Sequence, residues 1–284
     1  MAGLVLDRMR VEDVGLNPQR LAEAIHEQLA CNSGPVPVRD IALALDIEEI
    51  REAPLTSLEA ALVTTPERGC GKILLNSNSS RQRRRFSLGH ELLHFLNQCH
   101  EQTSSDGFHC SRADMRAWSS TESRHVRQEA EANTFAIELL VPRSRLKPLL
   151  RSPPDLEKVL KIADEFDISK EAAARRYVQL HADCMAVVFT KDRRFTYAER
   201  GRGFPFIEIR QDEECTIARV AAGAISEVDE VDASDWFAGN QDAQLTAQTL
   251  GQAQGYAITL LCAALPDEDD DPGIDDTFER FDRG

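Results

Sequence analysis

The sequence predicts an α+β fold built from three successive parts, and three observations indicate this. The first part mixes helical periodicity with a hairpin pattern, the second carries two helices joined by a tight turn, and the third changes to short apolar strands. A chain of 284 residues can bury a sizeable core and form two or three small domains. We expect domains at residues 1–150, 151–182 and 183–265, followed by a disordered acidic tail at residues 266–284.

Capping residues predict the first helices, and turn-forming residues predict the hairpin that follows them. Residues 17–31 are expected to form a helix that starts at Asn17-Pro18, and residues 38–45 a second, shorter helix. Two apolar runs, residues 58–64 and 72–75, flank a turn-forming segment and predict a β-hairpin. If a strand of this hairpin were an edge strand, it would suit the binding of an extended peptide.

Residues 83–96 contain a His-Glu-x-x-His motif, with histidines at positions 90 and 94. Residues four apart lie about 40° apart around a helix, so His90 and His94 direct their imidazoles toward one point. Apolar residues lie on the opposite side of this predicted helix, and Ser87 is its expected N-cap. The pattern predicts a metal clamp.

Glu91 lies about 100° around the helix from His90, where it can reach a metal-bound water but is badly placed to be a ligand. Two neutral imidazoles and a third ligand typically hold Zn²⁺, which acidifies a water, and a carboxylate takes the proton as the water attacks a carbonyl. We therefore interpret Glu91 as the catalytic general base. The expected metal is Zn²⁺, with Mn²⁺ as an alternative.

A third ligand is expected from a later helix. Residues 98–123 lose periodicity and predict a long loop over the site, and residues 124–140 form a second amphipathic helix that ends before Pro142. Glu129 lies in a stripe that turns apolar, so it needs a partner, and the metal can supply one. Asn133, one turn later, is expected to orient a ligand. The alternative is a solvated Glu129 near a helix start.

Several further residues stay open as alternatives. Glu131 is a rival third ligand but points about 200° away from Glu129, and His125 is a substitute ligand or a donor to an oxyanion. The pairs Cys99-His100 and His109-Cys110 have the residue types of a second zinc site, although their spacing fits no structural zinc pattern. Cys110 is also a candidate fourth ligand that would keep the resting site inactive.

Residues 156–166 and 170–180, with Ser169 as N-cap, predict a helix-turn-helix-like pair. Acidic residues outnumber basic ones there, so we expect the pair to pack on its neighbours or hold a partner, and we do not expect direct DNA binding. The C-terminal part is expected to form a small α/β domain. Its predicted strands are residues 185–190, 195–197, 206–209 and 258–263.

Charge and cysteine content indicate which partners and which cellular compartment we expect for the protein. The net charge of −15 disfavours non-specific binding to nucleic acid, and the tail contributes nine acidic and two basic residues to it. Seven cysteines without a repeating spacing favour reduced thiols. The sequence shows no membrane span or secretion signal, so we expect a cytoplasmic protein with no membrane partner.

The motif region resembles the ImmA/IrrE family of metallopeptidases, through residues 73–76, 85–94, 129–136 and 139–142. The resemblance implies a gluzincin-like minimal metallopeptidase domain, a zinc site of His90, His94 and Glu129, and Glu91 as catalytic acid/base. It implies as substrate a transcriptional repressor of the XRE helix-turn-helix type, cleaved in a stress response, and a GAF-like C-terminal domain. Leu93 stands where the family often has glycine.

The sequence thus predicts a zinc-dependent endopeptidase that cleaves a repressor to derepress its genes. The alternative is a non-catalytic regulator with a metalloprotease-like fold that binds a repressor, DNA or a toxin partner. A weaker alternative is a ligand sensor in which the C-terminal domain carries the function.

Overall fold

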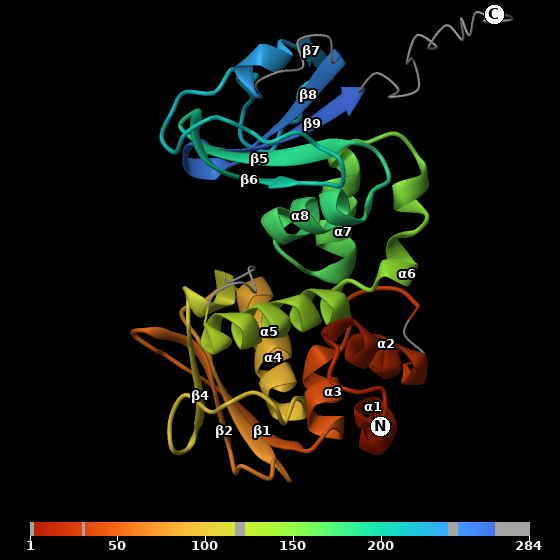
Figure 1. The fold of residues 1–284 in the computed structure, drawn as a ribbon, viewed down its shortest axis with the longest axis vertical. Coiled ribbons are helices and arrows are strands. Elements are labelled where there is room, and N and C mark those ends of the chain that lie inside the picture. Colours follow the sequence, from red (N-terminus) through yellow and green to blue (C-terminus); the bar gives the residue numbers. More distant parts are fainter. Residues whose placement is uncertain (1–2, 30–31, 117–122, 238–243, 265–284) are drawn as a thin grey trace, which may run out of the picture.

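The structure is a computed structural model that describes residues 3–29, 32–116, 123–237 and 244–264. It contains two separate β-sheets and a set of helices, so the predicted α+β class is confirmed. In Figure 1 the first sheet and the N-terminal helices lie at the bottom, a helical pair lies in the middle, and the second sheet lies at the top. The predicted tail at residues 266–284 lies outside the described residues.

The first sheet has four strands in the order β1-β3-β2-β4. The predicted hairpin is confirmed, because β2 and β3 pair antiparallel, while β1 runs parallel to β3 and β4 runs antiparallel to β2. The strands are β1 (Ile47–Ala53), β2 (Leu58–Thr64), β3 (Gly71–Asn76) and β4 (Gly107–Ser111). The prediction of a long loop over residues 98–123 was therefore wrong in part, since β4 lies within it.

Five helices accompany this sheet. The sequence did not predict the first; the bounds of the others agree with the predicted ones within a few residues, except at the start of the motif helix. The five helices are α1 (Arg8–Glu12), α2 (Pro18–Gln28), α3 (Val38–Ala44), α4 (Arg81–Leu96) and α5 (Arg124–Leu140). The helix that carries the His-Glu-x-x-His motif, α4, contacts α3, α5, β2 and β3. Its second half, from Ser87 onward, is buried on all sides.

The N-cap of α4 is Ser80, whose side chain accepts a hydrogen bond from the Arg83 backbone N–H at 3.2 Å. The prediction of Ser87 as N-cap was wrong, because the helix begins two turns earlier and includes the run of arginines. Arg85 lies 3.4 Å from Asp167, and Arg81 lies 2.6 Å from the same carboxylate. Pairing with Asp167 offsets the unfavourable position of these cations in the first turns of a helix.

A short helix, α6 (Arg143–Leu146), which was not predicted, follows α5. The predicted helix pair is confirmed as α7 (Leu156–Phe166) and α8 (Lys170–Leu180), with Ser169 capping α8. The second sheet follows with strand order β6-β5-β9-β8-β7. Its strands are β5 (Met185–Lys191), β6 (Arg194–Arg200), β7 (Asp229–Val231), β8 (Gln244–Gly251) and β9 (Tyr256–Ala264). Residues 206–209 form no strand; this prediction was wrong, and Ile207 instead packs into a core as part of an irregular segment.

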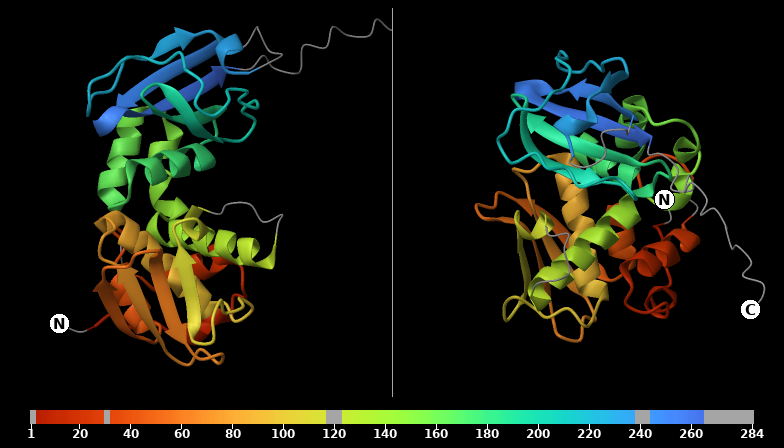
Figure 2. Two further views of the ribbon diagram at one scale, coloured as in Figure 1. Left: turned by 90° about the vertical axis from the view of Figure 1, so that its left-hand side faces the viewer. Right: turned by 45° about the horizontal axis from the view of Figure 1, so that its top comes forward.

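One hydrophobic cluster runs from the first sheet through α4, α5, α7 and α8 to one face of β5 and β9. A second cluster, centred on the buried Trp236, covers the other face of the second sheet. The two further views in Figure 2 show the helical pair α7 and α8 placed between the two sheets. No helix among the described residues is long and apolar enough to span a membrane.

Candidate metal centre

Helices α4 and α5 cross closely at the residue before the first motif histidine. A Cβ added at Gly89 would lie 3.3 Å from the Cα of Ala136, so the glycine allows a close approach of the two helices. This approach brings Glu129, two turns before Ala136 on α5, to the two histidines of α4. Glycine suits this position because even a Cβ would make an unusually tight contact with the facing helix.

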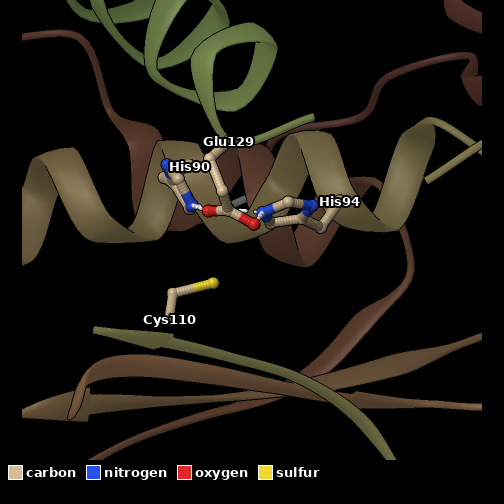
Figure 3. Close-up of side chains that lie close together, drawn as sticks. All are labelled: His90, His94, Cys110 and Glu129. Carbon is tan, nitrogen blue, oxygen red and sulfur yellow. Dashed lines mark hydrogen bonds and ion pairs between the residues drawn. The ribbon is translucent and has the colours of Figure 1, made fainter. Parts of the chain in front are cut away.

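His90, His94 and Glu129 direct their side chains toward one point, as Figure 3 shows. The Nε2 atoms of the two histidines lie 3.1 Å apart, and Oε2 of Glu129 lies 3.0 Å from Nε2 of His90. Oε1 of Glu129 lies 3.5 Å from Nε2 of His94. All three side chains are at most 1% exposed.

Asn133 orients His90 from one helical turn beyond Glu129. Its Oδ1 lies 2.9 Å from Nδ1 of His90, and its Nδ2 donates to the backbone carbonyl of Asp114 at 3.0 Å. A carbonyl oxygen can only accept, so Nδ1 of His90 carries the proton and Nε2 is left free to bind a metal.

His94 is oriented by a residue that the sequence analysis did not assign to this site. Its Nδ1 lies 2.9 Å from Nδ1 of His100, and Nε2 of His100 lies 3.0 Å from Oε2 of Glu131. If His100 donates its Nε2 proton to Glu131, its Nδ1 accepts the proton of His94 Nδ1. Nε2 of His94 is then free, and this is the tautomer that a metal ligand requires.

Arg68 fixes the segment that carries His100. Its buried guanidinium donates to the backbone carbonyls of Asn97 and His100, which follow the end of α4. Burial lowers the pKa of His100, so it stays neutral, as the hydrogen-bond chain to His94 requires.

The protonation of the cluster depends on burial and on its own contacts. Burial lowers the pKa of His94 to about 3. Burial opposes ionisation of His90 and Glu129, but their mutual contact outweighs it, so the pKa of His90 is raised and that of Glu129 is lowered. The cluster therefore offers neutral His94 and ionised Glu129, both of which are competent metal ligands.

Glu91 lies beside this cluster without a hydrogen-bond partner among the described residues for either carboxylate oxygen. Burial raises its pKa from an ordinary value of 4.5 to about 7. A carboxylate with a pKa near 7 can both take up and return a proton at neutral pH. The unpaired oxygens need a polar partner, such as a water or substrate group.

A fourth metal-ligating side chain comes from strand β4. The sulfur of Cys110, Nε2 or Nδ1 of both histidines and a carboxylate oxygen of Glu129 all lie within 4.8 Å of one another. In Figure 3, Cys110 extends from its strand toward the helix. Phe108, two residues earlier on the same face of β4, stacks on the His94 ring with centroids 4.4 Å apart.

The dimensions of the cluster fit a tetrahedral divalent ion. Ligand atoms bound at about 2.0–2.2 Å to such an ion lie about 3.3–3.6 Å apart. The two histidine Nε2 atoms are 3.1 Å apart, and different oxygens of Glu129 lie 3.0 Å from His90 and 3.5 Å from His94, so a bound ion needs these side chains to separate by only a few tenths of an ångström. Oε1 of Glu129 also lacks a hydrogen-bond partner among the described residues. Two imidazoles, a carboxylate and a thiol are donors that suit Zn²⁺.

The alternative candidates occupy other places. His125 is 45% exposed, with Nδ1 3.5 Å from Oε1 of Glu129 and Nε2 3.2 Å from Oδ1 of Asp114, so it borders the centre. Glu131 contacts His100, outside the ligand cluster. The second zinc site has no counterpart in the described part of the chain: Cys99 is exposed, and His109 lies 3.8 Å from Asp106.

Both arginines of α8 are used in internal contacts. Arg176 is buried and makes two hydrogen bonds to the Glu138 carboxylate on α5. Arg175 lies 3.1 Å from Glu199 on β6. This helix therefore connects the first part of the chain with the second sheet, in agreement with the predicted packing role.

Comparisons with known proteins agree with this site. Residues 48–177, a span that contains all four clustered residues and Glu91, match the IrrE N-terminal-like domain of the peptidase M78 family. A solved structure described as a Mycobacterium tuberculosis transcriptional regulator has a similar fold, with a TM-score of 0.54 and 14% identity over 90% of this chain and 79% of that one. No curated protein matches the chain significantly.

Proposed function

Because the chain belongs to the IrrE N-terminal-like peptidase family through residues 48–177, we propose that it is a zinc-dependent endopeptidase. His90, His94 and Glu129 hold the ion, with Mn²⁺ as an alternative metal. The observation that carries the proposal is the convergence of these three buried side chains beside an unpaired Glu91.

The proposed mechanism assigns proton transfer to Glu91. A bound divalent ion would polarise the scissile carbonyl and acidify a water. Glu91 accepts the proton of that water as it attacks the peptide carbon, and then delivers this proton to the departing amine nitrogen. The pKa of Glu91, raised by burial to about 7, suits both transfers, and Asn133 and His100 hold the two imidazoles in position.

We propose that the substrate is a protein of gene regulation, specifically a repressor of the XRE helix-turn-helix type, and that cleavage derepresses its genes in a stress response. Support comes from the family and from the structural neighbour, which is described as a transcriptional regulator. We place the enzyme in the cytoplasm, where such repressors act. Direct DNA binding is not part of the proposal, because the arginines of α8 are engaged in internal ion pairs.

The finer assignment of the fold belongs to the same proposal. We assign residues 1–150 to a gluzincin-like metallopeptidase domain, residues 151–182 to the helical connection and residues 183–265 to a GAF-like domain. The helix pair of α4 and α5 beside a mixed sheet supports the first assignment, and the five-stranded antiparallel sheet supports the last.

A Glu91→Gln variant tests this function. It should retain zinc, because Glu91 is not a ligand, and should lose cleavage of candidate repressors by at least about 100-fold. Zinc is measured by elemental analysis and cleavage by gel electrophoresis. Glu23→Gln, at an exposed position of α2, is the control and should cleave normally. Undiminished cleavage by Glu91→Gln would refute the mechanism.

A second candidate function is that of a non-catalytic regulator that keeps the metalloprotease fold and acts by binding a repressor, DNA or a toxin partner. The observation that favours it is the Cys110 thiol within 4.8 Å of the other three ligand atoms, because a site filled by four protein ligands resembles a structural zinc site. Zinc binding together with the absence of cleavage under all conditions would support this function.

A further inference from the structure

Strand β4 touches the metal centre with its inner face. Phe108 stacks on His94, and Cys110 places its sulfur within 4.8 Å of the three proposed ligand atoms. Both side chains are at most 1% exposed. Backbone pairing with β2 fixes the positions of these two side chains, because Cys110 lies opposite Ala60 and Phe108 lies opposite Leu62.

The outer edge of the same strand is closed by side chains. The backbone N–H of His109 donates to Oγ1 of Thr103 at 2.8 Å, and that of Ser111 donates to Oδ2 of Asp114 at 2.7 Å. These donors of an edge strand would otherwise be free to pair with an added peptide strand. In this conformation these two backbone donors are not available to a substrate. The position beside the metal cluster that the Cys110 thiol fills is not available either.

Glu91 is the second observation at this position. Its carboxylate oxygens are buried and have no partner in hydrogen-bond geometry among the described residues. The Cys110 thiol is close enough to lower the pKa of Glu91, against the larger effect of burial, which raises it. The thiol therefore lies near both the metal cluster and the proposed general base.

We propose that Cys110 is a fourth, removable metal ligand and that β4 holds the peptidase in a latent state. This inference rests on the proposed function only in requiring a bound ion at His90, His94 and Glu129. When the ion binds, the Cys110 thiol releases its proton to solvent and the thiolate joins the ion. Activation requires β4 to withdraw Cys110, which takes up a proton again and leaves the fourth position to water and substrate.

The segment after β4 couples the strand to α5. Asp114 caps the outer edge of β4 through its carboxylate, accepts from Asn133 through its backbone carbonyl, and contacts His125 through Oδ1. Displacement of Asp114 would therefore free one donor of the strand edge and also loosen the Asn133 contact that orients His90.

Cobalt substitution tests the ligand directly in the wild-type protein. The Co²⁺-loaded chain should show the near-ultraviolet charge-transfer band of a thiolate bound to cobalt, and Cys110→Ser should lack it. Cys99→Ser, at an exposed cysteine in the neighbouring turn, is the control and should keep the band. A tetrahedral Co²⁺ spectrum without a thiolate band in the wild type would overturn the proposal.

The zinc affinity and the cleavage rate of Cys110→Ser provide two further tests. Cys110→Ser should bind zinc at least about tenfold more weakly, yet at saturating zinc it should cleave repressor faster than the wild type. Equal zinc affinity in wild type and variant would contradict the ligand role, and slower cleavage at saturating zinc would contradict latency. Thermal unfolding of both proteins verifies that the variant is folded.

The outcomes separate this inference from the proposed function. A thiolate band without cleavage by either the wild type or Cys110→Ser supports the ligand and contradicts the peptidase, and with it latency. Cleavage by a wild-type protein that shows no thiolate band supports the peptidase and contradicts the role of Cys110.

Discussion

The helix side and the strand side of the metal centre are built in different ways. On the helix side, His90 and His94 are one turn apart on α4, and Glu129 meets them across the α4–α5 crossing. On the strand side, Cys110 and His100 arrive through the pairing of β4 with β2 and through a turn held by Arg68. Local helical periodicity therefore brings His90 and His94 together, whereas Glu129, Cys110 and His100 reach the cluster only through contacts between elements that are distant in the sequence.

The largest expected effect concerns the helix side. Glu129→Ala removes a charged ligand and should weaken zinc binding by about 100-fold or more, since a zinc site of four ligands contributes about 10–16 kcal/mol in total. Competition with a chromogenic chelator measures the affinity. Glu131→Ala serves as the comparison and should cost less, because Glu131 acts only through His100. An equal loss in both variants would remove the distinction between ligand and supporting residue.

These two sides also differ in how well the sequence predicted them. His90 and His94 were predicted from helical spacing, and Glu129 because an acid in an apolar stripe needs a partner; the structure brings these three side chains together. His100 was missed as a support of His94, because its position depends on a turn after α4 that carries no periodic signal. Cys110 was only one of several alternatives, since the signal that fixes it is the pairing of a five-residue strand with a partner about 50 residues earlier.

Longer elements also show that local sequence signals predict helices better than they predict strand pairing. The bounds of α5, α7 and α8 were predicted because capping residues and apolar periodicity coincide there. Strand β1 was missed because glutamates interrupt its apolar pattern, and residues 206–209 were mistaken for a strand because an apolar run alone does not specify pairing.

A second prediction concerns Glu91 in the metal-free protein. Its folded-state pKa of about 7 lies above the ordinary 4.5, so the folded chain holds an extra proton between these values and loses stability as the pH rises through this window. Glu91→Gln avoids this cost and should raise the free energy of unfolding at pH 8 by up to about 3 kcal/mol. Urea unfolding at pH 8 and pH 4.5 measures it.

The difference between the two proteins should shrink toward pH 4.5, where Glu91 is protonated in the folded and the unfolded chain. A constant difference at both pH values would mean that the variant changes packing and not ionisation. Both proteins are kept metal-free with a chelator, because a bound ion would alter the pKa of Glu91.

A third prediction compares the supports of the two histidines. Asn133→Ala on the helix side and His100→Ala on the strand side each leave a ligand imidazole without its hydrogen-bond partner. Each should weaken zinc binding by about 10–100-fold, as measured by chelator competition. Asn78→Ala, at an exposed position, should have no effect. Unchanged affinity in His100→Ala would show that His94 needs no support from the strand side.

The smallest expected effect concerns the ring stacked on His94. Phe108→Leu keeps most of the apolar volume but loses the aromatic contact at 4.4 Å, which should cost about 1 kcal/mol of stability. Urea unfolding of the metal-free protein measures it, with Phe206→Leu as the surface control, at a 69% exposed position where the ring contacts only the Arg200 guanidinium among the ring contacts of the described residues. A cost equal to that of the control would mean that β4 is held by its backbone pairing alone.

The zinc content of the purified protein tests most directly whether the α4–α5 cluster is a catalytic zinc site. It is measured in the wild type and in His94→Ala, and each protein is then incubated with candidate helix-turn-helix repressors. We predict about one zinc per wild-type chain and a discrete cleavage product, with both lost in His94→Ala. Absence of zinc from the wild type, or a product that persists in the metal-free variant, would contradict this prediction.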